Sequence, residues 1–531
     1  MPIGAMACAE WLNMIKDSES GLQERLVEIY GDDALILEDR KMIFLRALEG
    51  FATQFGGDRE VVISRAPGRI NLLGNHIDHR GGFVNYMAIN RDTLMVASAR
   101  QDDTVEMRNT NLGRFPPRSF EIGNLLPPEM RGNWLKYIEG LDLLPGDWSN
   151  YVQAAVLHLQ DRFPNQHLNG MDLVVTGDVP IAAGLSSSST LVVTSLQAAL
   201  HFSALTLPRE ELAEFCGDAE WYVGTRGGAG DHAAMLYAKR QAVLPLRFFP
   251  LETSEVLLPE GYRVVACNSF VEHAPPGIFN ERIATYEIGF LLIKSRFPRY
   301  APKLERLRDL SSDHLGIPLK EIYNMIKHLP SRMSRSEILT ALPDHVEFLQ
   351  TLFSPHGEPR DGYRIRQVMV FGLAECARGA QCKDLLESGD MDGFGRLKYC
   401  SHDGDRRFDF TSGDQGKSVD NAVGDGVLDQ LILDLESGES EKVNRAQIHH
   451  QPGGYDCSCE ELDLLVDLSA TVDGVVGAGL AGGGLGGCVL VVVKESAVNT
   501  LIQKLNDAFY TPRNLSNGTL VCASVAGSGL I

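Results

Sequence analysis

The stretch Arg65-Ala-Pro-Gly-Arg-Ile-Asn-Leu-Leu-Gly-Asn-His-Ile-Asp-His-Arg-Gly-Gly82 is dense in polar side chains, although it lies between apolar, β-rich runs. A guanidinium, an amide, an imidazole and a carboxylate fall close together and could contact one small polyhydroxylated ligand; they belong to Arg69, Asn75, His76 and Asp78. A surface turn with ion pairs is the plainer alternative. The segment indicates a β-rich domain with a candidate site for a polar small molecule.

The chain around this segment changes character several times. Residues 1–55 repeat apolar side chains at three- and four-residue steps, which predicts an N-terminal helical extension. From Val61 onward short β-rich runs alternate with loops and helical stretches, a pattern typical of α/β or α+β domains. Residues 288–355 are charged, helical in period and broken by prolines, so we expect a helical insertion there. The polar, glycine-rich stretch 412–456 predicts an irregular surface loop.

Composition limits the possible partners. With 531 residues, 44% of them hydrophobic, the chain can bury a large core and predicts two or three domains. The 70 acidic and 49 basic residues give a net charge of -21, which disfavours nucleic acid and anionic membranes as partners. The ten cysteines have no regular spacing, and we find neither a leader peptide nor an apolar run of about eighteen residues. We therefore expect a cytoplasmic protein with reduced thiols; no feature identifies a protein partner.

A second glycine-containing block runs Asp178-Val-Pro-Ile-Ala-Ala-Gly184-Leu-Ser-Ser-Ser-Ser-Thr190, after a strand-like run and before an apolar helical run. Such a turn points several N–H groups and a helix N-terminus at one place, and the serine hydroxyls add donors. A polyphosphate is a natural occupant. An ordinary helix cap on a serine-rich loop is an equally good reading of this block alone.

Two further motifs are rejected. Residues 477–482 match the GxGxxG pattern, but Gly483, Gly484, Gly486 and Gly487 follow, and each glycine inside a helix would cost about 1 kcal/mol relative to alanine. No dinucleotide-binding helix is expected there. Residues 416–418, Gly-Lys-Ser, resemble the end of a Walker A loop, but the leading glycine of that motif is missing and no strand precedes it.

The first block resembles the galactokinase signature of the GHMP kinase superfamily, which runs APGR-I/V-N-L-I/L-G-E-H-x-D and then Gly-Gly. Further blocks follow in the family's order. The Gly-Leu-Ser-Ser-Ser at 184–188 is similar to the phosphate-binding loop, and 223–232 looks like the segment that ends in Met-Asp-Gln, here Gly-Asp-His. The glycine-rich 477–488 also fits. Several blocks in order are far more specific than one alone.

This resemblance implies an α+β, two-lobed GHMP kinase fold with the active site in the cleft between the lobes. We expect an N-terminal helical extension at 1–55 and an N-terminal lobe at 56–260 with the sugar signature and the ATP-binding loop. A C-terminal lobe would span 261–531 and carry the helical insertion at about 288–355.

The resemblance also implies roles for single residues. Asp231 would accept the proton of the anomeric hydroxyl, and Arg69 would keep that carboxylate ionised and stabilise charge on the attacking oxygen. A helix cap or a structural salt bridge is the plainer role for Asp231. The implied sugar contacts are Asn75, His76, Asp78, Gly230 and Phe279.

ATP and Mg²⁺ are the implied co-substrate and cofactor. The adenine would lie near Trp148, because Trp-Ser-Asn-Tyr-Val resembles the family's Trp-x-Asn-Tyr-Val, although Trp148 could equally be core. The implied ATP contacts are Trp148, Gly184, Leu185, Ser186, Ser187 and Ser188. Magnesium would bind Ser187 or Ser188 together with Glu220, which lies one residue closer to the catalytic aspartate than the family's usual glutamate.

Two departures from the family pattern bear on the sugar. Asn75 replaces a glutamate that in galactokinases binds the carbon-6 hydroxyl, and Phe279 stands roughly where galactokinases have a sugar-contacting tyrosine. An amide is uncharged and would tolerate the carboxylate of a uronic acid. The sequence His-Ile-Asp-His-x-Gly-Gly is closer to that of plant galacturonokinases than to the His-Thr-Asp-Tyr of galactokinases. Galactose itself, a deoxy sugar and a pentose are also compatible.

The function favoured is an ATP-dependent sugar 1-kinase that phosphorylates the anomeric hydroxyl of galactose or a galactose-like sugar. Galacturonokinase-type specificity is one alternative. A sensor that binds sugar and ATP without turnover is another, supported by the replacements at Gly479 and Ala481 and opposed by the complete serine-rich loop, Arg69 and Asp231. A mevalonate-type kinase is disfavoured because that branch lacks the long sugar signature.

Overall fold

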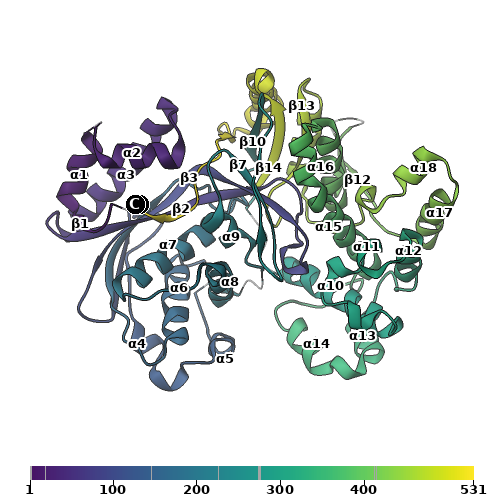
Figure 1. The fold of residues 1–531 in the computed structure, drawn as a ribbon, viewed down its shortest axis with the longest axis horizontal. Helices are drawn as coiled ribbons and strands as arrows, with labels where there is room; N and C mark the ends of the chain where they lie inside the picture. Colours follow the sequence, from purple (N-terminus) through teal and green to yellow (C-terminus); the bar gives the residue numbers. More distant parts are fainter. Residues whose placement is uncertain are drawn as a thin grey trace.

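The computed structural model describes residues 3–17, 19–144, 146–224, 227–272, 277–411, 413 and 415–531 (Figure 1). They form a mixture of helices and sheets, which confirms the α+β class. The two larger sheets have strand orders β1-β2-β3-β6-β4-β5 and β13-β14-β10-β15. Within the described parts of the chain, no helix is both long and apolar enough to span a membrane.

The first sheet is built around two long antiparallel strands, β2 (Glu60–Asn71) and β3 (Val84–Ala99). β3 also pairs with β6 (Met171–Gly177), which runs parallel to β4 (Thr104–Asn109). The shorter strands of this sheet are β1 (Met6–Ala7), β5 (Arg118–Glu121), β7 (Ala242–Arg247), β8 (Glu252–Thr253), β9 (Val256–Leu257) and β16 (Gly529–Leu530).

Helices cover both faces of the first sheet, which explains why its central strands β2 and β3 are buried along nearly their whole length (Figure 1). Leu94 and Val96 point to one face and pack with α3 (Ala34–Phe55). Met95 and Ala97 point to the other face, where they pack with the helices α6 (Ser149–Arg162), α7 (Ser187–Phe202) and α8 (Arg209–Glu220). The remaining elements near this face are α4 (Ile122–Leu125), α5 (Trp134–Glu139) and α9 (Gly230–Tyr237).

The second sheet consists of β13 (Val475–Leu480), β14 (Cys488–Lys494), β10 (Tyr262–Asn268) and β15 (Thr519–Cys522), all antiparallel. Its central strands β10 and β14 are largely buried on both faces as well, whereas the edge strand β15 is partly exposed. One face packs on α19 (Glu460–Ala470) and α20 (Val498–Leu505), and the other on α15 (Ile365–Ser388) and α16 (Met391–Asp405). The second sheet thereby brings α15 and α16 toward the first.

A separate helical layer packs against α15 and has its own apolar core. It begins with α10 (Gly277–Arg296) and continues through α11 (Ser312–Leu315), α12 (Leu319–Lys327), α13 (Arg335–Ala341) and α14 (Val346–Phe353). The helical character expected for 288–355 is therefore present. Arg366, near the start of α15, ties the layer down by donating to the carbonyls of Lys327 and Leu329.

The prediction of an irregular loop at 412–456 is wrong for about half of that segment. Residues 412 and 414 lie outside the described residues, but the rest contains β12 (Lys417–Ser418), paired with β11 (Phe408–Asp409), and the helices α17 (Asp425–Glu436) and α18 (Ser440–Arg445). Leu428 and Leu431 lie one turn apart and bury against the helical layer beside α12. Polar and glycine residues around them hide this short periodicity in the sequence.

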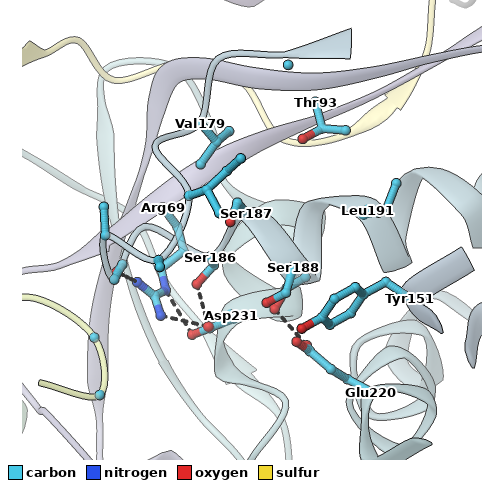
Figure 2. A pocket seen from close by; sticks show the side chains of 18 of the residues that line it. Arg69, Thr93, Tyr151, Val179, Ser186, Ser187, Ser188, Leu191, Glu220 and Asp231 are labelled. Carbon is cyan, nitrogen blue, oxygen red and sulfur yellow. Dashed lines mark hydrogen bonds and ion pairs between the residues drawn. The ribbon is translucent and has the colours of Figure 1, made fainter. Parts of the chain in front are cut away.

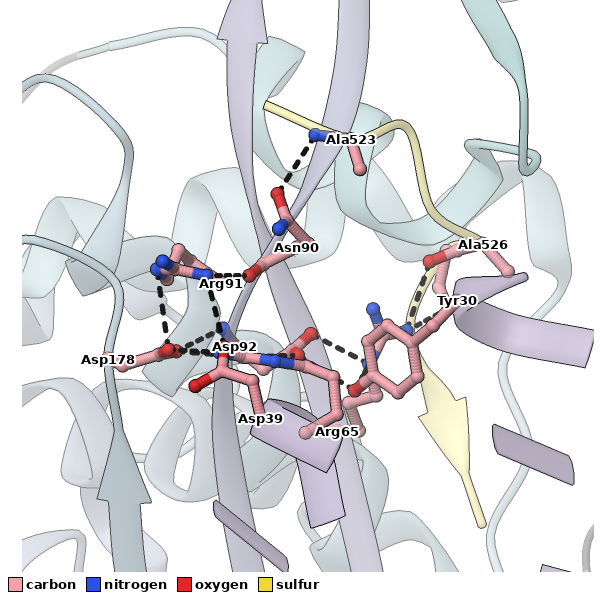
Figure 3. A network of polar contacts seen from close by, with 11 residues as sticks. Tyr30, Asp39, Arg65, Asn90, Arg91, Asp92, Asp178, Ala523 and Ala526 are labelled. Carbon is pink, nitrogen blue, oxygen red and sulfur yellow. Dashed lines mark hydrogen bonds and ion pairs between the residues drawn. The ribbon is translucent and has the colours of Figure 1, made fainter. Parts of the chain in front are cut away.

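Of the N-terminal helices, α2 (Gly21–Tyr30) and α3 are held on the first sheet by a network of buried polar and charged groups (Figure 3), and α1 (Cys8–Lys16) packs beside them. Arg40 in α3 donates to Asp92 of β3 (3.2 Å) and to Asp178 just after β6 (3.0 Å). Arg65 of β2 pairs with Asp92 (2.7 Å) and with the hydroxyl of Tyr30 in α2 (2.9 Å). The N-terminal helices thus cover one face of the first sheet.

The predicted boundaries 1–55, 56–260 and 261–531 stay predictions. Two observations bear on them. The helices α1, α2 and α3 fall within residues 8–55, and β16 near residue 531 pairs with β2, so the end of the predicted C-terminal lobe lies in the first sheet.

Candidate active site

One cavity of about 1020 Å³ collects the polar blocks that the sequence analysis selected. Its walls come from β2, the segment 179–191, α8, the start of α9 and the turn 482–485 between β13 and β14. Elements of both large sheets therefore contribute to it. A cavity of this size can hold a nucleotide and a sugar together.

Arg69 and Asp231 form a two-pronged ion pair in this cavity (Figure 2). Nε and Nη2 of Arg69 donate to the two carboxylate oxygens of Asp231 at 2.8 and 2.6 Å. Nη1 of Arg69 donates to the carbonyl of Gly184 (2.6 Å), and Ser186 Oγ donates to Asp231 (2.5 Å). Burial lowers the pKa of Arg69, but the nearby Asp231 and Tyr86 raise it further than burial lowers it. The guanidinium thus stays charged and joins the carboxylate to the loop before α7.

That loop has the shape of an anion cradle. Gly184 and Ser186 have φ angles of +75° and +63°, and α7 begins directly afterwards at Ser187. Ser186, Ser187 and Ser188 line the cavity beside this helix N-terminus, where N–H groups and the helix dipole favour negative charge. Leu185 does not line the cavity; its carbonyl accepts from the N–H of Arg69 (3.2 Å).

The rejected GxGxxG stretch forms the β13–β14 hairpin without a helix, as predicted. Its turn nevertheless lies against the anion cradle. A Cβ atom on Gly482 would come within 2.8 Å of the carbonyl of Gly184, so only glycine allows this approach. Gly482, Gly483 and Leu485 line the cavity. The family block at 477–488 thus supplies part of the wall.

The four predicted sugar contacts Asn75, His76, Asp78 and Phe279 line the same cavity. Asp78 accepts from the N–H of Gly230 (3.2 Å) and contacts His79 Nδ1 (2.9 Å). Burial raises the pKa of Asp78, but His79 and these N–H groups hold it well below the usual range. The fifth predicted contact, Gly230, does not line the cavity, and a Cβ atom there would collide with the hydroxyl of Tyr86.

The orientation of Asn75 is set by its neighbours. Asn71 Nδ2 donates to Asn75 Oδ1 (3.2 Å) and to the carbonyl of Gly74 (3.0 Å). Asn71 takes one of the two acceptor positions of the Asn75 oxygen, and among the described residues the Asn75 NH₂ group donates to no protein atom, so that group is free to donate to a ligand. A hydrogen-bond acceptor on the sugar is the matching partner.

Glu220, at the end of α8, lines the cavity with Ser187 and Ser188. It accepts from Ser189 Oγ (2.7 Å) and lies 2.9 Å from His232 Nε2; the sequence analysis had assigned neither contact. Burial raises the pKa of Glu220, yet His232 and the serine hydroxyls lower it by more, so the carboxylate is ionised. A hydroxyl and carboxylate set of this kind fits Mg²⁺, which prefers oxygen ligands. The described residues contain no cluster of three or more acidic, His or Cys side chains that could hold a metal ion.

Trp148 lines the cavity but is largely buried, and its Nε1 donates to the carbonyl of Pro116 (3.0 Å). Phe115 meets its ring edge-on at 6.3 Å. The cavity is also lined by residues that sequence reasoning did not select: Arg46, Asn109, Thr110, Asn111, Arg114 and Tyr151. They come from α3, from the end of β4 and the loop after it, and from α6; only Tyr151 belongs to a quoted motif, Trp-Ser-Asn-Tyr-Val.

Backbone strain provides a signal that no sequence pattern gives. Four residues other than glycine that line the cavity have positive φ angles: His76, Ala182, Ser186 and Leu485. Such conformations cost about 1–3 kcal/mol each and persist where surrounding structure fixes them, often at binding sites. Residues 225 and 226, within the predicted 223–232 block, lie outside the described residues.

Comparison with known proteins gives a consistent result. Residues 49–99 match the "Galactokinase galactose-binding signature", 150–239 match "GHMP kinases N terminal domain" and 434–511 match "GHMP kinases C terminal". A galactokinase of Dictyostelium discoideum is 27% identical over 94% of this chain and 95% of its own length. The galactokinase of Homo sapiens is 26% identical over 90% of this chain and 97% of its own.

Among solved structures, Lactococcus lactis galactokinase complexed with galactose superimposes with a TM-score of 0.64 at 21% identity, covering 91% of this chain and 98% of its own. The fold is similar to that of a galactokinase, and two segments of the chain match GHMP kinase domains. Within that class, the signature match and the relatives that align over most of the chain make it similar to galactokinases.

Proposed function

We propose that the protein is a sugar 1-kinase that transfers the γ-phosphate of ATP to the anomeric hydroxyl of galactose or a closely related sugar. The observation that carries this proposal is the Arg69 fork, which binds Asp231 with two nitrogens and the anion cradle at Gly184 with the third. A proton acceptor and a phosphate site are thereby held side by side. The names of the relatives support the same activity.

The chemistry follows from this placement. Asp231 accepts the proton of the anomeric hydroxyl as that oxygen attacks the γ-phosphorus in line. Arg69 stabilises the charge that develops between the attacking oxygen and the phosphate, and the buried fork is already oriented, so no reorganisation is needed. Ser186 donates to Asp231 and keeps the carboxylate turned toward the cradle.

ATP is the co-substrate, with its phosphates over Gly184, Leu185, Ser186, Ser187 and Ser188 and its adenine beside Trp148. We propose that Ser187 or Ser188 and Glu220 hold a Mg²⁺ ion, which would neutralise charge on the phosphate oxygens. The ionised Glu220 carboxylate in the same cavity supports this assignment. A cytoplasmic location and the absence of a nucleic-acid partner stay predictions from composition.

Uronic-acid specificity is a second candidate because of one observation: Asn75 is uncharged and offers its NH₂ group to the ligand. A carboxylate at carbon 6 is a better acceptor for that group than a hydroxyl. Asn75, His76, Asp78 and Phe279 are the proposed sugar contacts; Gly230 acts through Asp78.

The test is a coupled ADP-release assay with Mg-ATP across galactose, galacturonate, N-acetylgalactosamine, arabinose, fucose, glucose and mevalonate, with Asp231→Asn alongside. We expect turnover on galactose or galacturonate that Asp231→Asn loses. No turnover on any compound, with sugar and ATP still bound, would establish the sensor instead. Turnover on mevalonate alone would overturn the sugar assignment.

A further inference from the structure

A buried carboxylate from α15 holds the backbone of the turn that carries the sugar contacts. Oε1 of Glu375 accepts from the N–H groups of Gly74 (3.0 Å) and Asn75 (2.9 Å) and from Ser401 Oγ of α16 (2.9 Å). Glu375 has no exposed surface and does not line the cavity. Its carboxylate therefore holds the backbone of the turn without facing the cavity.

The charge of Glu375 is balanced within the same layer. Arg378, one turn along α15, donates to Oε2 (2.6 Å) and to the carbonyls of His449 and Gln451. Burial raises the pKa of Glu375, but Arg378 and the N–H of Asn75 lower it by more, so the carboxylate is ionised. Hydrogen bonds from N–H groups to an ionised carboxylate are stronger than neutral ones.

A second buried carboxylate faces the next residue of the turn. Oδ2 of Asp405, the last residue of α16, lies 3.5 Å from Nε2 of His76, and both side chains are almost fully buried. The His76 ring stacks on Tyr455 at 4.3 Å, and its backbone is in the left-handed region, with φ of +62°. That strained conformation needs partners to persist.

The helix and the turn are packed without slack. A Cβ atom on Gly379 would collide with the carbonyl of Phe83, the residue that closes the sugar-signature loop. Asn85 Nδ2 donates both to the carbonyl of Gly379 (3.0 Å) and to that of Leu73 (3.0 Å). A shift of α15 would therefore move the turn.

We propose that Glu375 and Asp405 are positioning residues for the sugar: neither touches it, and together they fix Asn75 and His76 where a sugar is bound. This inference rests on the proposed function, because it deepens the role of the same site. It implies that the sugar half of the cavity is set by α15 and α16, far from the phosphate cradle in the chain. Loss of either carboxylate should weaken sugar binding and leave ATP binding intact.

The experiment compares Glu375→Gln and Asp405→Asn with the unmodified protein and with a matched control, Asp463→Asn. Asp463 is equally buried, lies 3.1 Å from His402 and accepts from the N–H groups of Arg407 and Phe408, but it has no contact with the turn. Sugar dissociation constants come from calorimetry without ATP, KM values for sugar and ATP from the ADP assay, and thermal midpoints from circular dichroism.

We expect Glu375→Gln to raise the sugar dissociation constant and sugar KM by about tenfold or more, the loss that one charge-assisted hydrogen bond brings. Asp405→Asn should raise both by a smaller factor, because Oδ2 of Asp405 lies 3.5 Å from Nε2 of His76 without a hydrogen bond between them. The ATP KM should stay within about twofold. Asp463→Asn should lower the thermal midpoint and leave sugar binding unchanged. Equal sugar binding in all three variants would overturn the proposal and make both carboxylates merely structural.

If Glu375→Gln does not fold, a milder variant can still test the role of Glu375. Ser401→Ala removes one hydrogen bond to Oε1 and should raise the sugar dissociation constant by a smaller factor; no change there and in Asp405→Asn contradicts the proposal. Its failure is distinct from that of the proposed function. If the unmodified protein binds sugar without turnover, only the proposed kinase activity is overturned, because calorimetry still tests whether Glu375 and Asp405 position the sugar. If the unmodified protein binds no sugar, both proposals are overturned.

Discussion

At the scale of single residues, the Arg69 guanidinium is the group on which the site depends most, because its three nitrogens serve two different elements. Two nitrogens fix Asp231 at the start of α9 and one fixes Gly184 before α7. A lysine could supply the charge but not the planar fork. The geometry, more than the charge, is what a substitution would remove.

Arg69→Lys should therefore lower kcat by about 100- to 1,000-fold, the size of effect seen when one preorganised transition-state contact is lost. Steady-state kinetics with saturating sugar and ATP measure it. Arg100→Lys is the control, because Arg100 makes a similar fork to Asp102 on the surface. A kcat within about threefold of the unmodified enzyme would contradict the role given to the fork.

Asn75→Glu should change which sugar is preferred. The new carboxylate can still accept from Asn71, but it repels an acid group at carbon 6 and attracts a hydroxyl there. We expect the ratio of kcat/KM for galacturonate over galactose to fall by about tenfold or more, since an unmatched polar partner discriminates strongly. An unchanged ratio would show that Asn75 does not face carbon 6.

Lys398 is fully buried beside Glu375 and Asp405, and burial lowers its pKa to about 8. The unfolded chain keeps this proton up to a pKa near 10.5, so it binds more protons than the folded state between these values and stability rises with pH there. Relative to Lys398→Met, the unmodified protein should gain about 2 kcal/mol between pH 7.5 and 10. Urea unfolding of both proteins measures the difference, and a constant difference refutes it.

Some residues of the site could be predicted from the sequence, and others could not. Arg69, Asn75 and Asp231 were predictable because their chemistry is concentrated in short blocks. Arg46, from α3, was not, since it reaches the cavity only through the packing of that helix on the sheet. Neither was Glu375, whose partners lie 300 residues away in the chain.

At the scale of elements, the sequence predicts regular structure well where one apolar face is long. The N-terminal helices and the helices within 288–355 were predictable from their period. The α17 helix was missed because its buried face is short and its flanks are polar. The absence of a helix after β13 was predicted correctly from the run of glycines. The contact of the β13–β14 turn with Gly184 was not predictable, because it depends on tertiary packing.

The contact of α3 with the first sheet gives a prediction at this scale. Arg40→Met removes the partner that Asp92 and Asp178 share, while Asp92 keeps Arg65 and Asp178 keeps Arg91, so we expect a loss of about 1–3 kcal/mol. Because Asp178 opens the anion cradle, ATP KM should rise as well. Urea unfolding and ATP kinetics measure both effects.

Leu35→Ala on the same helix is the matched control, since Leu35 is 84% exposed. It should leave stability and ATP KM unchanged. If Arg40→Met behaved like this control, the network of Figure 3 would have no part in holding the cradle.

At the scale of the whole molecule, the cavity is walled by elements of both sheets, so a ligand there stabilises the two together. Saturating sugar or ATP, at about 100 times its dissociation constant, should stabilise the fold by about 2.7 kcal/mol. Asp231→Asn should keep this stabilisation while losing turnover. Thermal unfolding with and without each ligand measures it, and a variant that no ligand stabilises would place Asp231 in binding instead of catalysis.

The pairing of β16 with β2 joins residues that are more than 460 positions apart, and Arg65 of β2 donates to the carbonyls of Ala526 and Gly527. A ribosome adds about 5–20 residues each second, so β2 emerges about 20–90 s before its last partner. During that interval the nascent chain displays an unpaired strand edge and a guanidinium without its carbonyl partners. The strand that carries Arg69 thus has one of its three neighbours, β16, translated last, and until then its free edge is a place where a chaperone can bind.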